Sequence, residues 1–289
     1  MRDIDLQRYG RPVVSVDSSS GFELETMESI ISVARDGCPD LYGYANVVRS
    51  TTLNVVFHGA VRPGKDSYPR FDRVGSLGRS GDAFLAIADP TLMISDDISL
   101  AWYLGNRSWD PLEDIVKLIR AVSASSGAKE VNLIGGSGGG FAAMRVGAQI
   151  DDCLIFVFNP QTIIANYNRR VVEKYMSVAY PGENVEAVFS GDPERFDMRT
   201  VYSAPRAANR LFYLQHLGDG SHVAGHYRPF KRSLGVLAVE GDDASGRVRH
   251  VLVDAERDGH GPPLPLEFER HFTDALRWSR GLVARDAQD

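Results

Sequence analysis

Short and continuously apolar runs recur along the chain, separated by polar or helix-forming stretches. Runs of this length and composition are typical of strands that are buried on both faces, as in a parallel sheet. They predict five strands and a possible sixth: Leu53–Phe57, Ala83–Ala88, Val131–Ile134, Leu154–Phe158, Leu211–Gln215 and Val248–Val253.

Amphipathic helices are predicted between these strands. Asp110 and Pro111 are residue types favoured at a helix N-cap and first position, and one apolar stripe follows them as far as Gly127. A small-residue helix should follow Ser137, and a third should run from about Pro265 to Trp278. The alternation of strand and helix predicts an α/β fold with a doubly wound, mostly parallel sheet.

Two regions depart from this alternation. Residues 1–50 contain alternating stretches such as Pro12–Val16, which predict antiparallel strands at the sheet edge. Residues 160–209 form a long, aromatic-rich insertion, for which we expect a cap over a site; a crossover helix with a surface excursion would also fit. No composition shift marks a linker, so residues 1–289 are expected to form a single domain.

Charge and composition narrow the classes of partner. The net charge is −6 and no basic run occurs, so nucleic acid and anionic membrane are not expected partners. No stretch is apolar enough to span a membrane and no secretory signal is recognisable, which predicts a cytoplasmic protein. The only cysteines are Cys38 and Cys153, and Cys153 opens an apolar run as a buried thiol would, so no disulfide framework is expected.

The strongest chemical signal is Gly135–Gly139, which reads Gly-Gly-Ser-Gly-Gly between a predicted strand and a predicted helix. A G-x-S-x-G nucleophile elbow has this sequence in this setting, with its serine held in a strained turn. Ser137 is therefore the candidate nucleophile. A phosphate-binding P-loop fits poorly because Phe141 and Ala142 stand where Lys and Ser/Thr are needed. A dinucleotide-binding loop or an inert turn would also place glycines after a strand.

A serine hydroxyl needs a base and a group that orients the base, and an elbow enzyme has them in the chain order serine, acid, histidine. His260 lies in a loop directly after the last predicted strand, and Asp219 follows the strand before it. They are the candidate base and acid. The reserve candidates for the acid are Asp192 and Asp197 in the insertion. Asp254 and Asp258 are close to His260 in sequence, but closeness in sequence does not direct their side chains toward it.

An oxyanion hole requires two backbone N–H donors, usually one after the nucleophile and one after an earlier strand. Gly138 is the candidate for the first, and Gly59 or Ala60 for the second.

Three further side chains are candidates for substrate binding. His58 can act there or as a structural hydrogen-bonding group, and His222 and Tyr167 can line the pocket. His222 and His226 are spaced as zinc ligands on a helix are, but the Glu of H-E-x-x-H is missing, so no metal site is predicted.

The elbow Gly135–Gly139, together with His58-Gly59, Asp219 and His260, resembles the α/β-hydrolase superfamily over residues 51 to 280. The stretches Ala101–Gly105 and Tyr213–His222 also resemble a bacterial subset associated with glycan-linked acyl chemistry in accessory secretion and capsule systems. The resemblance implies acyl transfer to water or to another nucleophile, without a cofactor.

Three functions are consistent with these residues. The first is a serine hydrolase of the esterase or thioesterase type, with a small-molecule or glycan-linked acyl substrate. The second is an acyltransferase that passes the acyl group to a sugar or another alcohol with the same residues. The third is a non-catalytic partner protein that keeps the fold. The sequence leaves the acyl group, the acceptor and the oligomeric state open.

Overall fold

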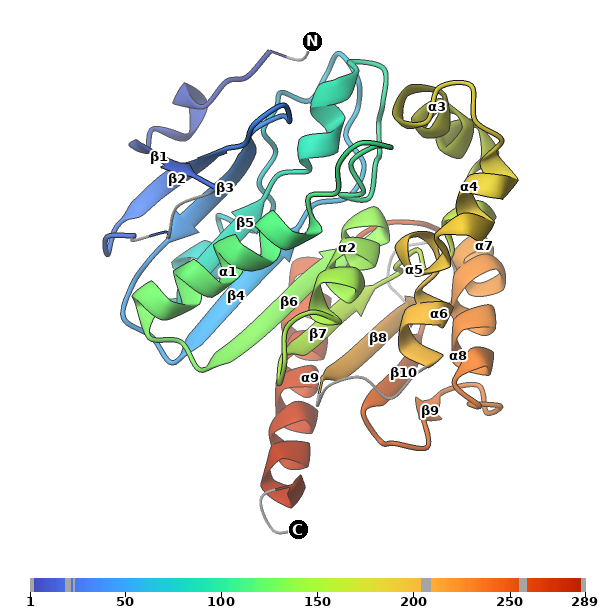
Figure 1. The fold of residues 1–289 in the computed structure, drawn as a ribbon. Helices are drawn as coiled ribbons and strands as arrows, with labels where there is room; N and C mark the ends of the chain where they lie inside the picture. Colours follow the sequence, from blue (N-terminus) through green and yellow to red (C-terminus); the bar gives the residue numbers. More distant parts are fainter. Residues whose placement is uncertain (1–2, 19–21, 23, 204–208, 255–258, 287–289) are drawn as a thin grey trace.

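The computed structural model describes residues 3–18, 22, 24–203, 209–254 and 259–286. Within these residues, ten strands form one sheet in the order β1-β2-β3-β5-β4-β6-β7-β8-β10-β9 (Figure 1). Their bounds are β1 Val13–Asp17, β2 Glu28–Ala34, β3 Leu41–Asn46, β4 Thr52–Phe57, β5 Ala83–Ile87, β6 Glu130–Gly136, β7 Leu154–Phe158, β8 Arg210–His216, β9 Gly241–Asp242 and β10 Val248–Val253.

The centre of the sheet is parallel. Strands β5, β4, β6, β7, β8 and β10 run in one direction, whereas β3 is antiparallel to both of its neighbours and β9 is antiparallel to β10. The six predicted strands are present with ends within two residues of those expected. The central strands β4, β5, β7 and β8 are buried along their whole length, which explains their continuous apolar runs.

Residues 1–50 do contain antiparallel strands, since β2 pairs antiparallel with β3. The prediction is wrong for the first strand. The stretch around Pro12–Val16 does form an edge strand, β1, but β1 pairs parallel with β2, not antiparallel. Alternation between exposed and half-buried positions reveals that one face of a strand is solvated, and it carries no information about the direction of the partner strand.

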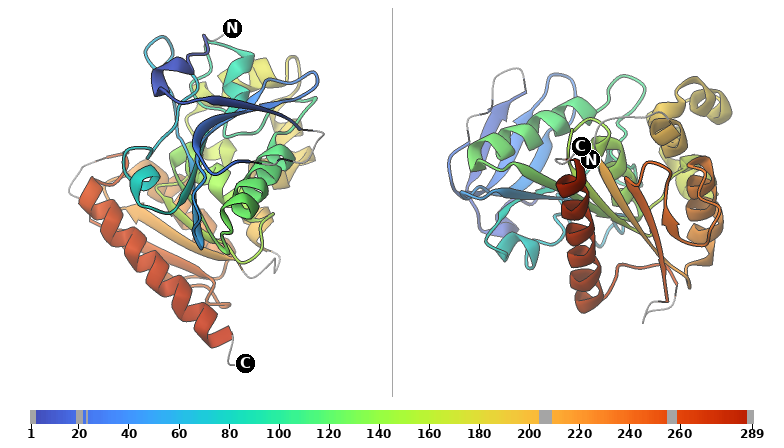
Figure 2. Two further views of the ribbon diagram at one scale, coloured as in Figure 1. Left: turned by 90° about the vertical axis from the view of Figure 1, so that its left-hand side faces the viewer. Right: turned by 90° about the horizontal axis from the view of Figure 1, so that it is seen from below.

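Helices cover both faces of the sheet, as the doubly wound prediction requires. Helices α1 (Leu112–Ser126) and α2 (Ser137–Gly147) lie on one face, and α9 (Pro265–Asp286) lies on the other (Figure 2). The N-cap of α1 is Pro111, one residue later than predicted, and the Asp110 carboxylate accepts the backbone N–H of Leu112. Gly127 ends α1 in a left-handed conformation, as predicted. On the opposite face, Phe268 and Phe272 of α9 pack against Phe156 of β7.

The remaining helices lie mostly between β7 and β10 along the chain. They are α3 Arg169–Ala179, α4 Val185–Gly191, α5 Pro193–Phe196, α6 Met198–Ser203, α7 Gly220–His222 and α8 Arg228–Ser233, with a π-helical turn η5 at Val223–Tyr227. Short 3₁₀ turns are η1 Gln7–Tyr9, η2 Leu77–Arg79, η3 Pro90–Ile94 and η4 Ile164–Asn166.

The insertion after β7 packs as a group of short helices beside the sheet (Figure 1). Its α5 is attached to the loop before α1, because the guanidinium of Arg195 donates to the carbonyl oxygens of Asn106 and Trp109 over 3.0 Å.

Two further predictions concern burial and membranes. Cys153 is buried, as expected, and burial raises the pKa of its thiol to about 12. Among the described residues, no helix has both the length and the apolar character needed to cross a bilayer.

Candidate active site

Ser137 lies at the sharp turn between β6 and α2, where its φ of +54° is in the left-handed region. Glycines on both sides make this turn possible. A Cβ atom on Gly135 would lie 2.2 Å from the carbonyl oxygen of Gly139, and one on Gly139 would lie 2.3 Å from the carbonyl oxygen of Phe57. The elbow is therefore packed backbone against backbone, with its serine side chain at the carboxyl end of the sheet.

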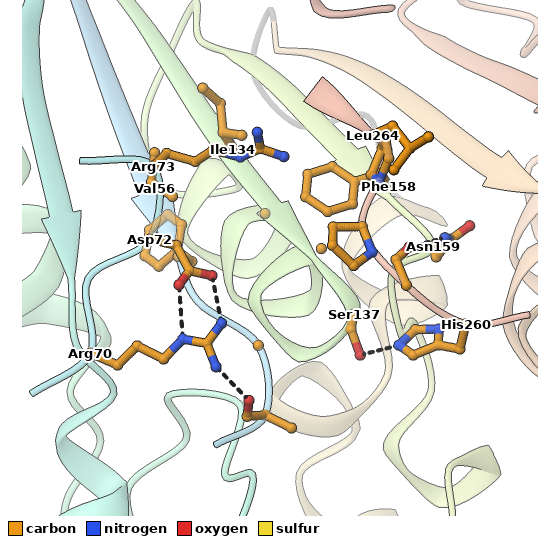
Figure 3. Close-up of a pocket in the computed structure, with 18 of the residues that line it drawn as sticks. Val56, Arg70, Asp72, Arg73, Ile134, Ser137, Phe158, Asn159, His260 and Leu264 are labelled. Atoms are coloured by element: carbon orange, nitrogen blue, oxygen red, sulfur yellow. Dashed lines mark hydrogen bonds and ion pairs between the residues drawn. The ribbon is translucent and has the colours of Figure 1, made fainter. Parts of the chain in front are cut away.

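The structure brings Ser137, His260 and Asp219 together from the ends of three strands. The Nε2 atom of His260 lies 3.0 Å from the Oγ atom of Ser137 (Figure 3), and its Nδ1 atom lies 2.6 Å from Oδ2 of Asp219. The His260 side chain is 37% exposed, whereas that of Asp219 is 2% exposed. The candidate base is thus open to solvent, and it is joined to a candidate acid that is buried.

Asp219 uses its two carboxylate oxygens differently. Oδ1 accepts hydrogen bonds from the backbone N–H of His222 and from the Ser221 hydroxyl, so it caps the short helix α7, and Oδ2 faces His260. Burial alone would raise the pKa of Asp219, but hydrogen bonds from His222 and His260 outweigh it and hold the pKa well below its ordinary value. Asp219 is therefore ionised at neutral pH.

Gln161 is a second partner of the serine, which sequence reasoning missed. Its Nε2 donates a hydrogen bond to Ser137 Oγ over 2.9 Å, and its Oε1 accepts one from the indole N–H of Trp102. An indole N–H can only donate, so Trp102 fixes which end of the amide faces the serine. Because the amide N–H also only donates, the serine proton must point toward His260.

His222 lies beneath His260. The two rings stack with centroids 4.1 Å apart, and Nδ1 of His222 lies 3.1 Å from Oδ1 of Asp219. Burial lowers the pKa of His222, and lowers that of the adjacent His226 to about 3, so both rings are neutral at pH 7.

Asp219, His222 and His260 offer ligand atoms within 4.8 Å of one another, a spacing that a metal ion can use. Two imidazole N–H groups donating to one carboxylate account for the same spacing without an ion.

The predicted oxyanion donors lie beside the elbow. Gly138 is the second residue of α2, where a backbone N–H has no acceptor within the helix. A Cβ atom on Gly59 would lie 3.7 Å from Cβ of Ser137, and Gly59 and Ala60 both line the cavity at the serine.

The side chain of His58 is buried, with 2% exposed, and it holds the loop that carries Gly59 and Ala60 in place. Its Nδ1 lies 2.7 Å from the carbonyl oxygen of Gly59, and its Nε2 accepts the backbone N–H of Asp89 over 3.0 Å. Its backbone N–H donates to the hydroxyl of Tyr103 over 2.9 Å. These contacts correspond to a structural role for His58.

The loop that carries His260 is attached to β7 through Asn159. The Asn159 amide donates to the carbonyl oxygen of Gly261 over 2.9 Å, and its oxygen accepts the backbone N–H of His216 over 2.7 Å. Asn159 has a φ of +44°, so a non-glycine residue is held in the left-handed region where it makes these contacts. One amide therefore links β7, β8 and the histidine loop.

A cavity of about 630 Å³ opens at Ser137 and His260. Its wall includes Tyr167, as predicted, but His222 is 4% exposed and lies behind His260, so the structure gives it a supporting position. The wall also includes three charged residues from the loop after β4 that the sequence pattern did not single out: Arg70, Asp72 and Arg73.

The other aspartates considered for the acid lie elsewhere or outside the described residues. Asp192 ends α4 and Asp197 pairs with Arg199 at 2.6 Å, while Asp254 is exposed after β10. Asp258 lies outside the described residues.

One sequence signal could have identified Asn159 and Gln161 as site residues. Each is a polar residue close to the carboxyl end of a predicted strand. Both follow the run Leu154–Phe158, but neither side chain is a carboxylate, so neither was a candidate for the acid. Trp102 and Arg73 had no such signal, because each lies in a long loop whose path the sequence pattern does not specify.

Comparison with known proteins identifies the fold. Neither a protein-family model nor a curated protein sequence matches the chain. Among solved structures, the capsule O-acetyltransferase of Neisseria meningitidis serogroup A is similar with a TM-score of 0.55 and 16% identity, over 89% of this chain and 94% of that one. An acetyl xylan esterase from Paenibacillus sp. R4 gives a TM-score of 0.56 and 16% identity, over 83% and 80%.

The glycosylation-associated Gap123 complex of Streptococcus agalactiae gives a TM-score of 0.60 and 13% identity, over 87% of this chain and 46% of that one. At these identities the likeness concerns the fold alone. It confirms the α/β-hydrolase fold that the elbow and the strand order predict.

Proposed function

We propose that this protein is a serine-dependent enzyme that cleaves a carboxylic ester or thioester, with Ser137 as nucleophile, His260 as general base and Asp219 as the acid that orients it. The observation that carries the proposal is the continuous hydrogen-bond path from Ser137 through His260 to Asp219, at 3.0 and 2.6 Å. Neighbours with the same fold include an acetyl xylan esterase and a capsule O-acetyltransferase, which supports acyl chemistry as the class.

In the first half of the reaction, Oγ of Ser137 attacks the acyl carbon as its proton passes to Nε2 of His260. The carbonyl oxygen becomes an oxyanion that accepts the backbone N–H of Gly138 and that of Gly59 or Ala60. The tetrahedral intermediate then collapses. The bond to the leaving alcohol or thiol breaks, and His260 returns the proton to that leaving group, so that an acyl-serine remains.

In the second half, water gives its proton to His260 and attacks the acyl-serine, which releases the carboxylic acid and regenerates the Ser137 hydroxyl. Asp219 remains ionised throughout and stabilises the imidazolium that forms twice in the cycle. Each oxyanion donor contributes a factor of about 10²–10³ in rate.

Transfer to a sugar hydroxyl or another alcohol is the second candidate. It differs from hydrolysis only in the molecule that attacks the acyl-serine. The observation that favours it is that the structural match to the capsule O-acetyltransferase extends over 94% of that chain. Product analysis separates the two reactions: para-nitrophenyl acetate is supplied with and without N-acetylglucosamine, and acetate and acetylated sugar are measured by mass spectrometry.

The test of the nucleophile is labelling with a fluorophosphonate probe and mapping of the modified residue by mass spectrometry. We expect labelling at Ser137 in the wild-type protein and its loss in Ser137→Ala and His260→Ala. Ser190→Ala is the matched control, because Ser190 is an exposed serine outside the site, and it should label as the wild type does. Labelling that persists in Ser137→Ala, or a folded wild type that neither labels nor cleaves any ester, would refute the proposal and favour a non-catalytic partner protein.

A further inference from the structure

Arg73 forms part of the wall of the cavity that opens at Ser137. The cavity reaches from Ser137 and His260 to the loop after β4, and Figure 3 shows Arg73 away from the serine, with Ile134 beside its guanidinium. Ile134 lies three residues before Ser137 on β6, which is about 10 Å along a strand. The cavity therefore extends from the candidate nucleophile to a cationic side chain.

The other arginine of the cavity wall is already neutralised. Arg70 Nε lies 2.8 Å from one carboxylate oxygen of Asp72, and its second terminal nitrogen lies 3.4 Å from the other. A third nitrogen of Arg70 donates to the carbonyl oxygen of Ala60 over 3.1 Å, and Asp66 adds a second ion pair at 3.6 Å. Through these contacts Arg70 holds the loop that carries Gly59 and Ala60, and it engages both carboxylate oxygens of Asp72.

Arg73 has a different environment. Within the described part of the chain, the structure gives its guanidinium no ion pair and no hydrogen-bond acceptor. Its carbon Cζ lies 3.7 Å from the ring centroid of Phe268, which is 2% exposed. Burial lowers the pKa of Arg73, and the charge of the neighbouring Asp72 offsets only part of that effect.

The backbone conformation of Arg73 also requires an explanation. Its φ is +63°, although it is not a glycine. Non-glycine residues in this region are strained and persist where the surrounding structure holds them, often at ligand sites. Here the strained turn positions the guanidinium over Phe268 at the cavity wall. A partly desolvated cation with five donors is well suited to bind an anion.

We infer that Arg73 binds an anionic group, a carboxylate or a phosphate, on the substrate whose acyl carbon reaches Ser137. Val56, Ile134, Phe158 and Leu264 line the same cavity, so the part of the substrate between the anion and the scissile bond is apolar. This inference names the substrate class of the proposed esterase and rests on that proposed function.

The test compares two para-nitrophenyl esters of equal chain length. The hexanoate is neutral, and the adipate mono-ester adds one terminal carboxylate. We expect the wild type to prefer the adipate ester in kcat/KM, and Arg73→Gln to reduce that preference by about 10- to 100-fold while hexanoate cleavage is retained. Arg73→Lys, which keeps the charge and loses the fork, should retain part of the preference. Arg79→Gln is the matched control, an exposed arginine in the same loop region.

A second pair of substrates identifies the source of the anion. Acetyl-CoA carries phosphates that S-acetylpantetheine lacks. If Arg73 binds a phosphate, Arg73→Gln slows acetyl-CoA cleavage and leaves S-acetylpantetheine cleavage unchanged. If it binds an acyl-chain carboxylate, only the adipate preference changes. Unchanged ratios in both pairs, in a folded Arg73→Gln variant that still cleaves the neutral esters, overturn the inference and leave the proposed function intact.

A binding measurement covers the case in which no ester is cleaved. Calorimetry on Ser137→Ala, with and without Arg73→Gln, uses monomethyl adipate, methyl hexanoate and CoA as titrants. Binding of an anionic titrant that depends on Arg73 supports the anion site even if the proposed function fails. Equal binding, or none, to the two proteins overturns it.

Discussion

The side-chain amide of Gln161 donates a hydrogen bond to the Ser137 hydroxyl oxygen over 2.9 Å, opposite the 3.0 Å contact of that oxygen with His260. The serine oxygen thus accepts from one side chain and donates to the other. Gln161 is a fully buried polar residue, and Trp102 fixes the orientation of its amide.

Gln161→Ala should lower kcat by about 10- to 100-fold, because the serine proton loses its defined direction and one donor to the reacting oxygen disappears. Gln161→Glu should be at least as damaging at neutral pH, since a carboxylate accepts the serine proton in competition with His260. Steady-state kinetics with para-nitrophenyl acetate measures both effects. Trp102→Phe removes the indole donor that orients the Gln161 amide, and it should lower kcat by a smaller factor than Gln161→Ala does. Wild-type kcat in Gln161→Ala would show that the contact has no part in catalysis.

His222→Phe tests the histidine that shares the carboxylate of Asp219. Phenylalanine keeps the ring against His260 and removes the N–H donor to Oδ1. The carboxylate of Asp219 then has one donor fewer, so its negative charge stabilises the protonated base more strongly. The acidic limb of the pH profile of kcat/KM should therefore move to higher pH, by up to about one unit. Because burial keeps His222 neutral, its own titration does not set the wild-type limb.

The control for that measurement is His226→Phe. His226 lies beside His222 with ring centroids 4.9 Å apart, and its Nδ1 accepts the backbone N–H of Thr162 instead of facing the carboxylate of Asp219. Its pH profile should match that of the wild type. An equal shift in the two variants would mean that general loosening of the site, rather than the lost donor to Asp219, moves the limb.

His250 should make the folded protein sensitive to mild acid. It is 1% exposed in β10, and burial lowers its pKa from 6.5 to about 4. The folded value lies below the unfolded one, so its contribution is fully present above pH 6.5 and is lost as the pH falls toward 4. At pH 5 this histidine is protonated in the unfolded chain and neutral in the folded protein. The difference lowers the free energy of unfolding by about 2 kcal/mol relative to pH 7.

His250→Phe should therefore lose about 2 kcal/mol less between pH 7 and pH 5 than the wild type loses. Urea unfolding at the two pH values gives the difference directly. Tyr213, Tyr227 and Phe230 surround the ring, so the aromatic replacement suits the site. Parallel pH dependence in the two proteins would contradict the assignment of the acid sensitivity to His250.

Gly135→Ala should destabilise the protein by about 1–3 kcal/mol and abolish probe labelling, because the new Cβ would lie 2.2 Å from the backbone oxygen of Gly139. A backbone atom cannot rotate away as a flexible side chain can. Gly191→Ala is the matched control, since a Cβ atom there meets nothing within 4 Å. Thermal unfolding and fluorophosphonate labelling check both variants, and full labelling of a stable Gly135→Ala would contradict this account of the elbow.

The parts of the site that could be predicted from sequence share one property. Ser137, Asp219 and His260 each follow a predicted parallel strand, and the carboxyl ends of parallel strands meet at one edge of the sheet. The order serine, acid, histidine along the chain then indicates which role each residue has. Their proximity follows from the fold class. The position of each side chain can therefore be predicted from the few residues around it.

Trp102 and Arg73 reach the site from loops, at positions where the chain adopts positive φ without glycine. Sequence signals for that conformation normally are glycine or asparagine, so the sequence does not show that either side chain reaches the site. The parallel pairing of β1 was missed for a related reason, since a strand's own alternation does not specify its partner. In each case the conformation depends on contacts that are distant in the chain.

Trp102 and Tyr103 are consecutive residues with φ of +53° and +59°. From this one turn, Trp102 donates a hydrogen bond to Gln161, and the Tyr103 hydroxyl accepts the backbone N–H of His58. The contacts of both Ser137 and the loop that carries Gly59 therefore depend on it. Glycine would relieve the strain at either position and remove the anchoring side chain with it. Selection for thermal stability alone would therefore tend to erode this turn, and a stabilised variant of the protein should be checked here first for lost activity.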